Sequence, residues 1–128
     1  GLGFAFLSYT NAVLESGVKI ILEETKLESF IKNADFVITG EGRLDGQTVM
    51  GKAPIGVAEI AKKYEKKVLA FGGCVAEDAT LCNQYGIDAF FPILRTVTTL
   101  KEAMDFNHAK ENLSAAVEQV FRLIQSFK

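Results

Sequence analysis

The sequence has no tryptophan, one histidine, two prolines and two cysteines in 128 residues. Two cysteines without a C-x-x-C pair do not make a disulfide scaffold, and they favour a reducing compartment, so we expect a cytoplasmic protein. No run approaches ~18 consecutive apolar residues, so no membrane-spanning helix is predicted. The net charge is −2. No basic face is therefore expected, and nucleic acid is not a predicted partner.

The residues that are present describe an ordinary globular domain. The hydrophobic fraction is 48% and the charged fraction is 23%, as in typical soluble domains. A chain of this length can bury a core of its own. It opens at Gly1, without Met and inside an apolar pattern. We therefore expect residues 1–128 to be one α/β domain or part of one, cut from a longer protein.

Three short apolar runs have the composition of buried strands. They cover residues 36–39, 68–71 and 89–93. Gly72 and Gly73 are expected to end the second strand, and Pro92, late in the third, indicates that this strand is an edge strand or is ending there. Strands that are apolar on both faces and alternate with helices predict a parallel sheet with flanking helices and right-handed crossovers.

Apolar residues spaced three and four apart predict the helices. The first is expected over residues 2–14, with short helical turns before Asn33. Pro54 near a first turn predicts a second helix, and a Thr99/Glu102 capping box predicts another. The remaining expected helices cover residues 79–85, closed by Gly86, residues 100–104, and a long segment from a cap at Asn107.

The stretch from Asp35 to Pro54 organises the rest of the chain. It reads D-F-V-I-T-G-E-G-R-L-D-G-Q-T-V-M-G-K-A-P, which predicts a strand, a charged glycine-rich loop and a helix. Carboxyl ends of parallel strands meet at one edge of a sheet, where ligands bind in such folds. The loops expected to meet there cover residues 40–52, 72–78 and 94–98.

The charged residues of this loop suit phosphoryl-transfer chemistry. Lys52 precedes a helix N-terminus, which favours anions, and Arg43 adds donors suited to phosphate. Glu41 and Asp45 can hold a divalent cation or orient a hydroxyl nucleophile. The competing interpretation is a solvated turn whose charges pair with one another.

A P-loop is a weaker interpretation of the same stretch. Residues 46–53 almost match G-x-x-x-x-G-K-[ST], but Ala53 lacks the hydroxyl that Mg²⁺ requires. The other candidate residues are expected to be structural. We predict a surface or capping role for His108 and packed positions for Cys74 and Cys82.

The loop resembles the signature of the bacterial glycerate kinases of the glycerate 2-kinase type. The shared motif is T-G-E-G-R-L-D-G-Q-T-x-x-G-K-A-P, preceded by A-D-F-V-I. The resemblance continues through V-L-A-F-G-G, Y-G-I-D-A-F-F-P-I, L-K-E-A-M and the closing amphipathic helix, and it covers the whole chain. It implies the C-terminal portion of a protein about three times as long, with two α/β domains, one of them flavodoxin-like, and a cleft between them.

The resemblance also implies phosphoryl transfer from Mg²⁺·ATP to D-glycerate, giving 2-phosphoglycerate. Asp45, Glu41 and Lys52 would be catalytic, and Asp45 or Glu41 would hold Mg²⁺; which carboxylate does which task stays open. Substrate or phosphate would be bound by Arg43, Gln47, Thr48, Gly40, Gly42, Gly46, Gly72 and Gly73.

Two alternatives remain at this point. One is a kinase for another small hydroxy acid, and the other is a non-catalytic flavodoxin-like module that binds an anion or nucleotide. Apolar faces on residues 2–14 and on the final helix are expected to pack against the missing N-terminal part or a second copy, as a homodimer.

Overall fold

The structure is a computed structural model that describes residues 13–16 and 24–127. Four parallel strands form one sheet, in the order β1-β2-β3-β4. The strands are β1 (Val13–Ser16), β2 (Phe36–Leu44), β3 (Lys67–Val75) and β4 (Ala89–Pro92). The helices are α2 (Glu24–Asn33), α3 (Ala53–Lys63), α4 (Leu100–Met104) and α5 (Phe106–Gln125), with 3-10 helices η1 (Gly46–Val49) and η2 (Glu77–Tyr85). The expected α/β class, a parallel sheet with flanking helices, is confirmed.

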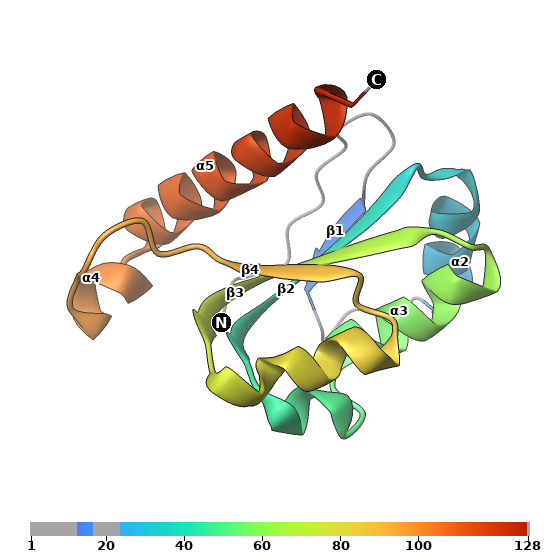
Figure 1. Ribbon diagram of the computed structural model, residues 1–128, viewed down its shortest axis with the longest axis horizontal. Helices are drawn as coiled ribbons and strands as arrows, with labels where there is room; N and C mark the ends of the chain where they lie inside the picture. The colour runs from blue at the N-terminus through green and yellow to red at the C-terminus, as the bar shows by residue number, and fades with distance from the viewer. Residues whose placement is uncertain (1–12, 17–23, 128) are drawn as a thin grey trace.

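The sheet is the middle layer of three (Figure 1). One face carries the core shared with α2, α3 and η2, in which Ile31, Val57 and Val68 have no exposed surface. The opposite face is covered by α5, through Val117, Val120 and Phe121. A sheet covered on both sides explains why its strands have the continuous apolar composition seen in the sequence.

Aromatic side chains fix α5 on its face of the sheet. Phe36 at the start of β2 meets Phe121 edge to face, with ring centroids 5.8 Å apart. Phe71 and Phe91 stack across β3 and β4 at 5.5 Å. Both distances lie in the range in which aromatic pairs attract one another beyond simple burial. The core therefore holds the ends of β2, β3 and β4 in a fixed relation.

The first predicted helix is partly wrong. Val13 and Leu14 belong to β1, which pairs in parallel with Val37 and Ile38 of β2. Parallel pairing with β2 overrides a helical spacing that is only a weak prior. The rest of that expected helix lies outside the described residues. Of the helical turns expected before Asn33, the described part forms α2, and the part before Glu24 lies outside the described residues.

The glycines do not end the strands where the sequence predicted. β2 continues through Gly40 to Leu44, and β3 continues through Gly72 and Gly73 to Val75. A Cβ on Gly72 would lie 3.1 Å from Leu44 Cδ1, and one on Gly73 would lie 2.9 Å from the Gly42 carbonyl oxygen. These glycines allow the two strands to approach closely, a role that a reading of glycine as a strand breaker overlooks.

The helix boundaries are mostly as expected. Pro54 lies in the first turn of α3, and Gly86 closes η2 in the left-handed region at φ 100°. Thr99 caps α4 by accepting the Glu102 N–H, although the Glu102 carboxylate accepts from Thr98 Oγ1 instead of completing the predicted box. α5 is capped by Asp105 rather than Asn107. Pro92 is the last residue of β4, which is an edge strand as predicted.

Candidate active site

The candidate residues gather where β2 and β3 end. Glu41 and Arg43 lie on the last part of β2, opposite Gly72 and Cys74 of β3. The glycine-rich loop is therefore shorter than predicted, since it begins only after Leu44. Placing the two charged residues on a paired strand gives them a more rigid support than an open loop would.

Asp45 organises the turn from β2 into η1. Its Oδ1 accepts the Gln47 N–H at 2.9 Å, and its own N–H donates to Thr48 Oγ1 at 3.1 Å. This is a reciprocal capping box, of the kind that satisfies the free backbone groups at a helix start. The residues Asp45-Gly46-Gln47-Thr48 carry a sequence signal for this box, an N-cap aspartate with a threonine three residues later.

The same aspartate holds Arg43. Asp45 Oδ2 accepts from Arg43 Nε at 3.0 Å, and the Asp45 side chain is only 14% exposed while that of Arg43 is 61% exposed. Both Asp45 oxygens are thus engaged, and the terminal nitrogens of the guanidinium remain at the surface. Burial alone would raise the pKa of Asp45, but the bonds from Arg43 and the Gln47 N–H, with the charge of Lys52, outweigh it and lower this pKa.

Glu41 has the opposite electrostatic environment. Burial raises the pKa of its carboxyl above the ordinary value, while the charge of Lys52 acts in the other direction. Glu41 is half-buried, and no side chain among the described residues hydrogen-bonds to its carboxylate. A carboxylate with a raised pKa and free oxygens is better suited than Asp45 to accept a proton.

The N-terminus of α3 is open to an anion. Lys52 occupies the N-cap position and no side chain caps this helix. Gly51 just before it adopts φ +89°, and a Cβ there would meet nothing within 4 Å. Pro54 has no N–H, and the N–H groups of Ile55 and Gly56 donate to the Lys52 carbonyl. The Ala53 N–H, the helix dipole and the exposed lysine thus coincide at one point.

The other predicted site residues divide into open and enclosed positions. Gln47 is exposed, and a Cβ on Gly42 would meet open space. Thr48 is fully buried and its hydroxyl is used by the cap. Gly40 is buried in β2 and Gly72 in β3, while Gly46, beside Asp78 of η2, and Gly73, beside Gly42, are half-buried. Gln47 and Gly42 are therefore the most exposed of these candidate residues.

The two cysteines differ from each other. Cys82 is buried as predicted, and its thiol lies 3.9 Å from the Asp45 carbonyl oxygen, which links η2 to the turn. Burial, reinforced by the negative charge of Asp45, raises the pKa of this thiol. The packed position predicted for Cys74 is wrong, because Cys74 is exposed and its Sγ lies 3.9 Å from Arg43 Nη1. It lines the candidate site because β3 extends past Gly73.

His108 lies in the first turn of α5, away from the Glu41–Lys52 turn, as predicted. Its Nδ1 is 3.4 Å from Asp105 Oδ2. Within the part of the chain that the structure describes, no three histidine, cysteine, aspartate or glutamate side chains form a cluster suited to a metal ion. No described helix is long and apolar enough to cross a membrane.

Comparison with known proteins decides the family. Residues 1–125 match the model of the glycerate kinase family. The chain belongs to this family. It is 42% identical over 128 residues to the glycerate kinase of Bacillus subtilis (strain 168), covering 100% of this chain and 33% of that protein. It is 42% identical over 120 residues to the glycerate 2-kinase of Escherichia coli (strain K12), covering 94% and 31%.

A solved structure agrees with the family assignment. The putative glycerate kinase 2 from Salmonella typhimurium LT2 superposes with a TM-score of 0.58 at 36% identity, over 84% of this chain and 26% of that one. The chain thus spans about a third of the length of the curated relatives it matches. As a member of a kinase family, it carries the turn described above on a fold shared with a glycerate kinase.

Proposed function

We propose that this chain supplies one side of the active site of a kinase that transfers the terminal phosphoryl group of ATP to D-glycerate, giving 2-phosphoglycerate. The supporting observation is the turn from Glu41 to Lys52. It combines a proton-accepting carboxylate, an anchored guanidinium and an open helix N-terminus in a member of the glycerate kinase family. The cytoplasm, where ATP is abundant, is the proposed setting.

Arg43 and Lys52 bind the anionic groups. The Arg43 guanidinium is held at Nε by Asp45, so its outer nitrogens can form a paired contact with the carboxylate or a phosphate of a substrate. Lys52 and the Ala53 N–H at the start of α3 bind phosphate oxygens, and Lys52 neutralises charge as it moves to the leaving group. Gln47 and the exposed backbone at Gly42 add hydrogen bonds from the same turn.

Glu41 orients the attacking hydroxyl and accepts its proton. As the oxygen of glycerate bonds to phosphorus, the bond to the ADP oxygen breaks and the hydroxyl proton passes to Glu41. Asp45 is the weaker base, because its pKa is lowered and both oxygens are occupied. Its role is to position Arg43, and buried Thr48 acts indirectly by keeping Asp45 in place.

Magnesium fits this arrangement in one way. Mg²⁺ uses one or two protein carboxylates, substrate phosphates and water, so no cage of three acidic side chains is needed. Asp45 would hold the ion through a bridging water, which leaves the Glu41 carboxylate to accept the proton. The ion would neutralise charge on the phosphates.

The test is D-glycerate-dependent release of ADP. It is measured on the full-length product of the gene that encodes this chain, with the 128-residue chain beside it. Saturable release that other small hydroxy acids inhibit by competition supports the proposal, and preferential turnover of another hydroxy acid would reassign the substrate. If neither protein releases ADP with any of these acids, phosphoryl transfer is wrong and the turn is an anion-binding site.

A further inference from the structure

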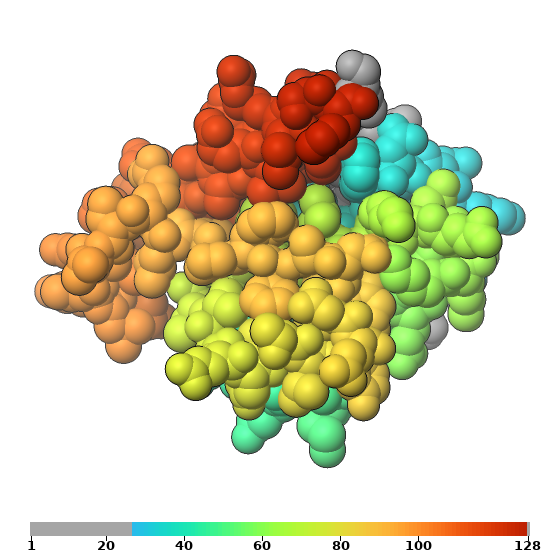
Figure 2. Space-filling view, viewed as in Figure 1, coloured from blue at the N-terminus to red at the C-terminus, as the bar shows by residue number. Residues whose placement is uncertain are grey.

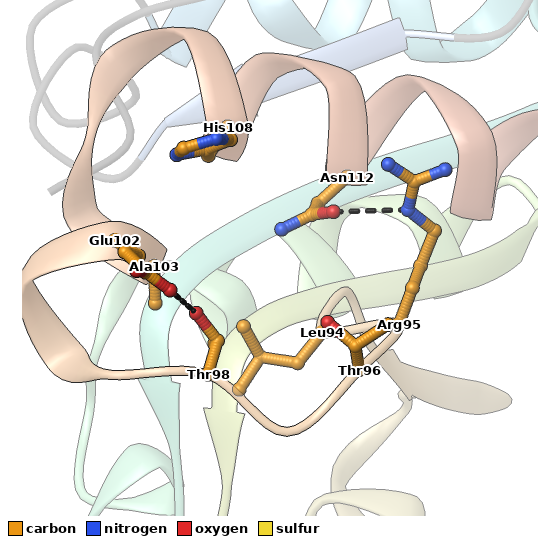
Figure 3. A pocket seen from close by; sticks show the side chains of 8 residues that line it. All are labelled: Leu94, Arg95, Thr96, Thr98, Glu102, Ala103, His108 and Asn112. Carbon is orange, nitrogen blue, oxygen red and sulfur yellow. Dashed lines mark hydrogen bonds between the residues drawn. The ribbon is translucent and has the colours of Figure 1, made fainter.

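A hollow beyond the end of β4 contains one arginine of the carboxyl edge of the sheet. The hollow has a volume of about 400 Å³ and lies between residues 94–98, α4 and the first turns of α5 (Figure 3). Arg95 lines it and donates from Nε to Asn112 Oδ1 at 3.0 Å. No other group among the described residues hydrogen-bonds to the Arg95 guanidinium, so the plane of this guanidinium can swing about a single contact.

Arg43, in the other half of this edge, is held at two points instead of one. Its Nε donates to Asp45 Oδ2 at 3.0 Å, and its Nη1 donates to Cys74 Sγ at 3.9 Å. The Cys74 side chain is exposed beside the guanidinium, and the proposed reaction gives it no task. The two arginines therefore differ in one respect that can be tested, the second contact from a thiol.

The pairing of the strands brings this thiol to Arg43. Cys74 is the partner of Arg43 in the parallel register of β2 and β3. β3 can extend as far as Cys74 because Gly73 lies close to β2, where a Cβ on Gly73 would be 2.9 Å from the Gly42 carbonyl oxygen. The contact thus comes from paired backbone rather than from a flexible loop, and paired strands hold a side chain more precisely.

A thiol is suited to orienting an arginine that must still bind an anion. The guanidinium is planar, and Nε–H and Nη1 lie on opposite sides of it, so a contact on each side stops the plane from swinging. Sulfur is a weak and uncharged acceptor. It therefore adds no second negative charge beside Asp45, and Arg43 keeps its attraction for an anion. Three of the five N–H donors of Arg43 remain for a ligand.

We propose that Cys74 is a positioning residue for the anion-binding arginine of this site. Its thiol accepts from Nη1 and fixes the guanidinium plane of Arg43, so that the remaining N–H groups meet the carboxylate or phosphate of a substrate in one orientation. Cys74 acts only through Arg43 and does not itself touch the substrate. The inference rests on the proposed role of Arg43 in the kinase reaction.

The first experiment measures the motion of the guanidinium without any reaction. The full-length product of the gene is labelled with ¹⁵N-arginine, and the Nη signals report how fast each guanidinium turns about Nε–Cζ, which exchanges Nη1 with Nη2. Cys74→Ala should make this rotation roughly threefold faster at Arg43, the effect of losing one weak hydrogen bond. Cys74→Ser, which keeps an acceptor, should restore most of the slow rate, and Arg95 should not change. An Arg43 rate that Cys74→Ala leaves unchanged would overturn the inference.

Steady-state kinetics test the consequence for binding. Arg43→Lys identifies the substrate whose anionic group this arginine binds, because the KM of that substrate should rise most. Cys74→Ala should raise the same KM roughly threefold and leave kcat within about twofold, and Cys74→Ser should recover most of the loss. The matched control is Thr80→Ala, at an exposed residue of η2, which should leave both constants within about twofold. An equal rise in the KM of both substrates, or an equal effect of Thr80→Ala, would contradict the inference.

The two proposals fail in different ways. If glycerate-dependent ADP release occurs but Cys74→Ala changes neither the rotation of Arg43 nor the KM of either substrate, Cys74 is not a positioning residue and the kinase stands. If no hydroxy acid yields ADP, the reaction is wrong and the affinity for inorganic phosphate replaces KM. Weaker phosphate binding by Cys74→Ala, restored in Cys74→Ser, would then support the positioning role, and equal binding by all three proteins would overturn it.

Discussion

The two halves of the carboxyl edge are built differently. The stretch from Glu41 to Lys52 is held by a capping box, an ion pair and a contact from η2. The stretch from Leu94 to Phe106 contains α4, which has no buried residue, and it protrudes from the body of the molecule (Figure 2). Its large apolar side chains are exposed: Val97, Leu100, Met104 and Phe106.

This difference suits the two stretches to different tasks, the Glu41–Lys52 stretch to catalysis and the Leu94–Phe106 stretch to binding. Groups that act on a transferring phosphoryl must be held in advance, because small displacements are costly in rate. A surface that receives another part of a longer protein can have apolar area left to cover. The following predictions compare matched changes in the two halves, from the largest effect to the smallest.

The largest expected effect is on turnover, at Glu41. Glu41→Gln keeps the shape but removes the proton acceptor, so ADP release should fall by about 10²- to 10⁴-fold, the usual contribution of a general base. The control is Glu59→Gln on the exposed face of α3, which should leave the rate within about twofold. A Glu41→Gln enzyme of normal rate would return the role of base to Asp45.

The next effect is on stability and uses one leucine from each half. Leu44 is fully buried in the core, whereas Leu100 is 76% exposed. Leu44→Ala should lower the free energy of unfolding by about 2–5 kcal/mol, and Leu100→Ala should change it by less than about 0.5 kcal/mol. Urea denaturation of the two variants measures the difference. A similar loss of stability for Leu100→Ala would show that α4 is covered in solution, by a second copy for example. The two halves of the carboxyl edge would then not differ in burial.

Local sequence signals predicted one half of the edge better than the other. Lys52 before Pro54 specified where α3 begins, because proline and the helix dipole act within one turn. The extension of β2 and β3 through their glycines was not predictable in this way, since it depends on contact between Gly73 and Gly42, 31 positions apart. The same holds for β1, whose strand geometry comes from pairing with β2.

The β4 half was predicted less well for a different reason. Asp105 and Asn107 are both good N-cap residues, and the choice between them depends on how closely α4 and α5 follow one another. The hollow beside them is formed by three separate segments. No motif in the sequence marks it, so only the arrangement in space could reveal it.

A smaller effect is expected from two threonines. Thr48→Val leaves the partly buried Asp45 N–H without its acceptor, which should lower the free energy of unfolding by about 1 kcal/mol. Thr98→Val removes a hydrogen bond at the surface and should change stability by less than about 0.5 kcal/mol. The KM for glycerate should rise only in Thr48→Val, because only this change loosens the Asp45–Arg43 pair. Equal behaviour of the two variants would mean that the capping box does not order the turn.

The smallest effect is the pH dependence of stability within the Glu41–Lys52 half. The pKa of Asp45 is lowered in the folded chain, so its contribution is present above the unfolded pKa of ~3.9 and is lost as pH falls through the folded value. The pKa of Glu41 is raised, so the fold favours its protonated form; this stability is present below the unfolded pKa and is lost as pH rises through the folded value, where the ionised carboxylate is destabilising. At neutral pH, Glu41→Gln should therefore raise the unfolding midpoint while Asp45→Asn lowers it, and at pH 3 both differences should shrink. Thermal unfolding at the two pH values checks this. A stabilising Asp45→Asn at neutral pH would show that the bonds from Arg43 and Gln47 do not compensate for the burial of the Asp45 carboxylate. The turn from Glu41 to Lys52 would then not be preorganised by Asp45.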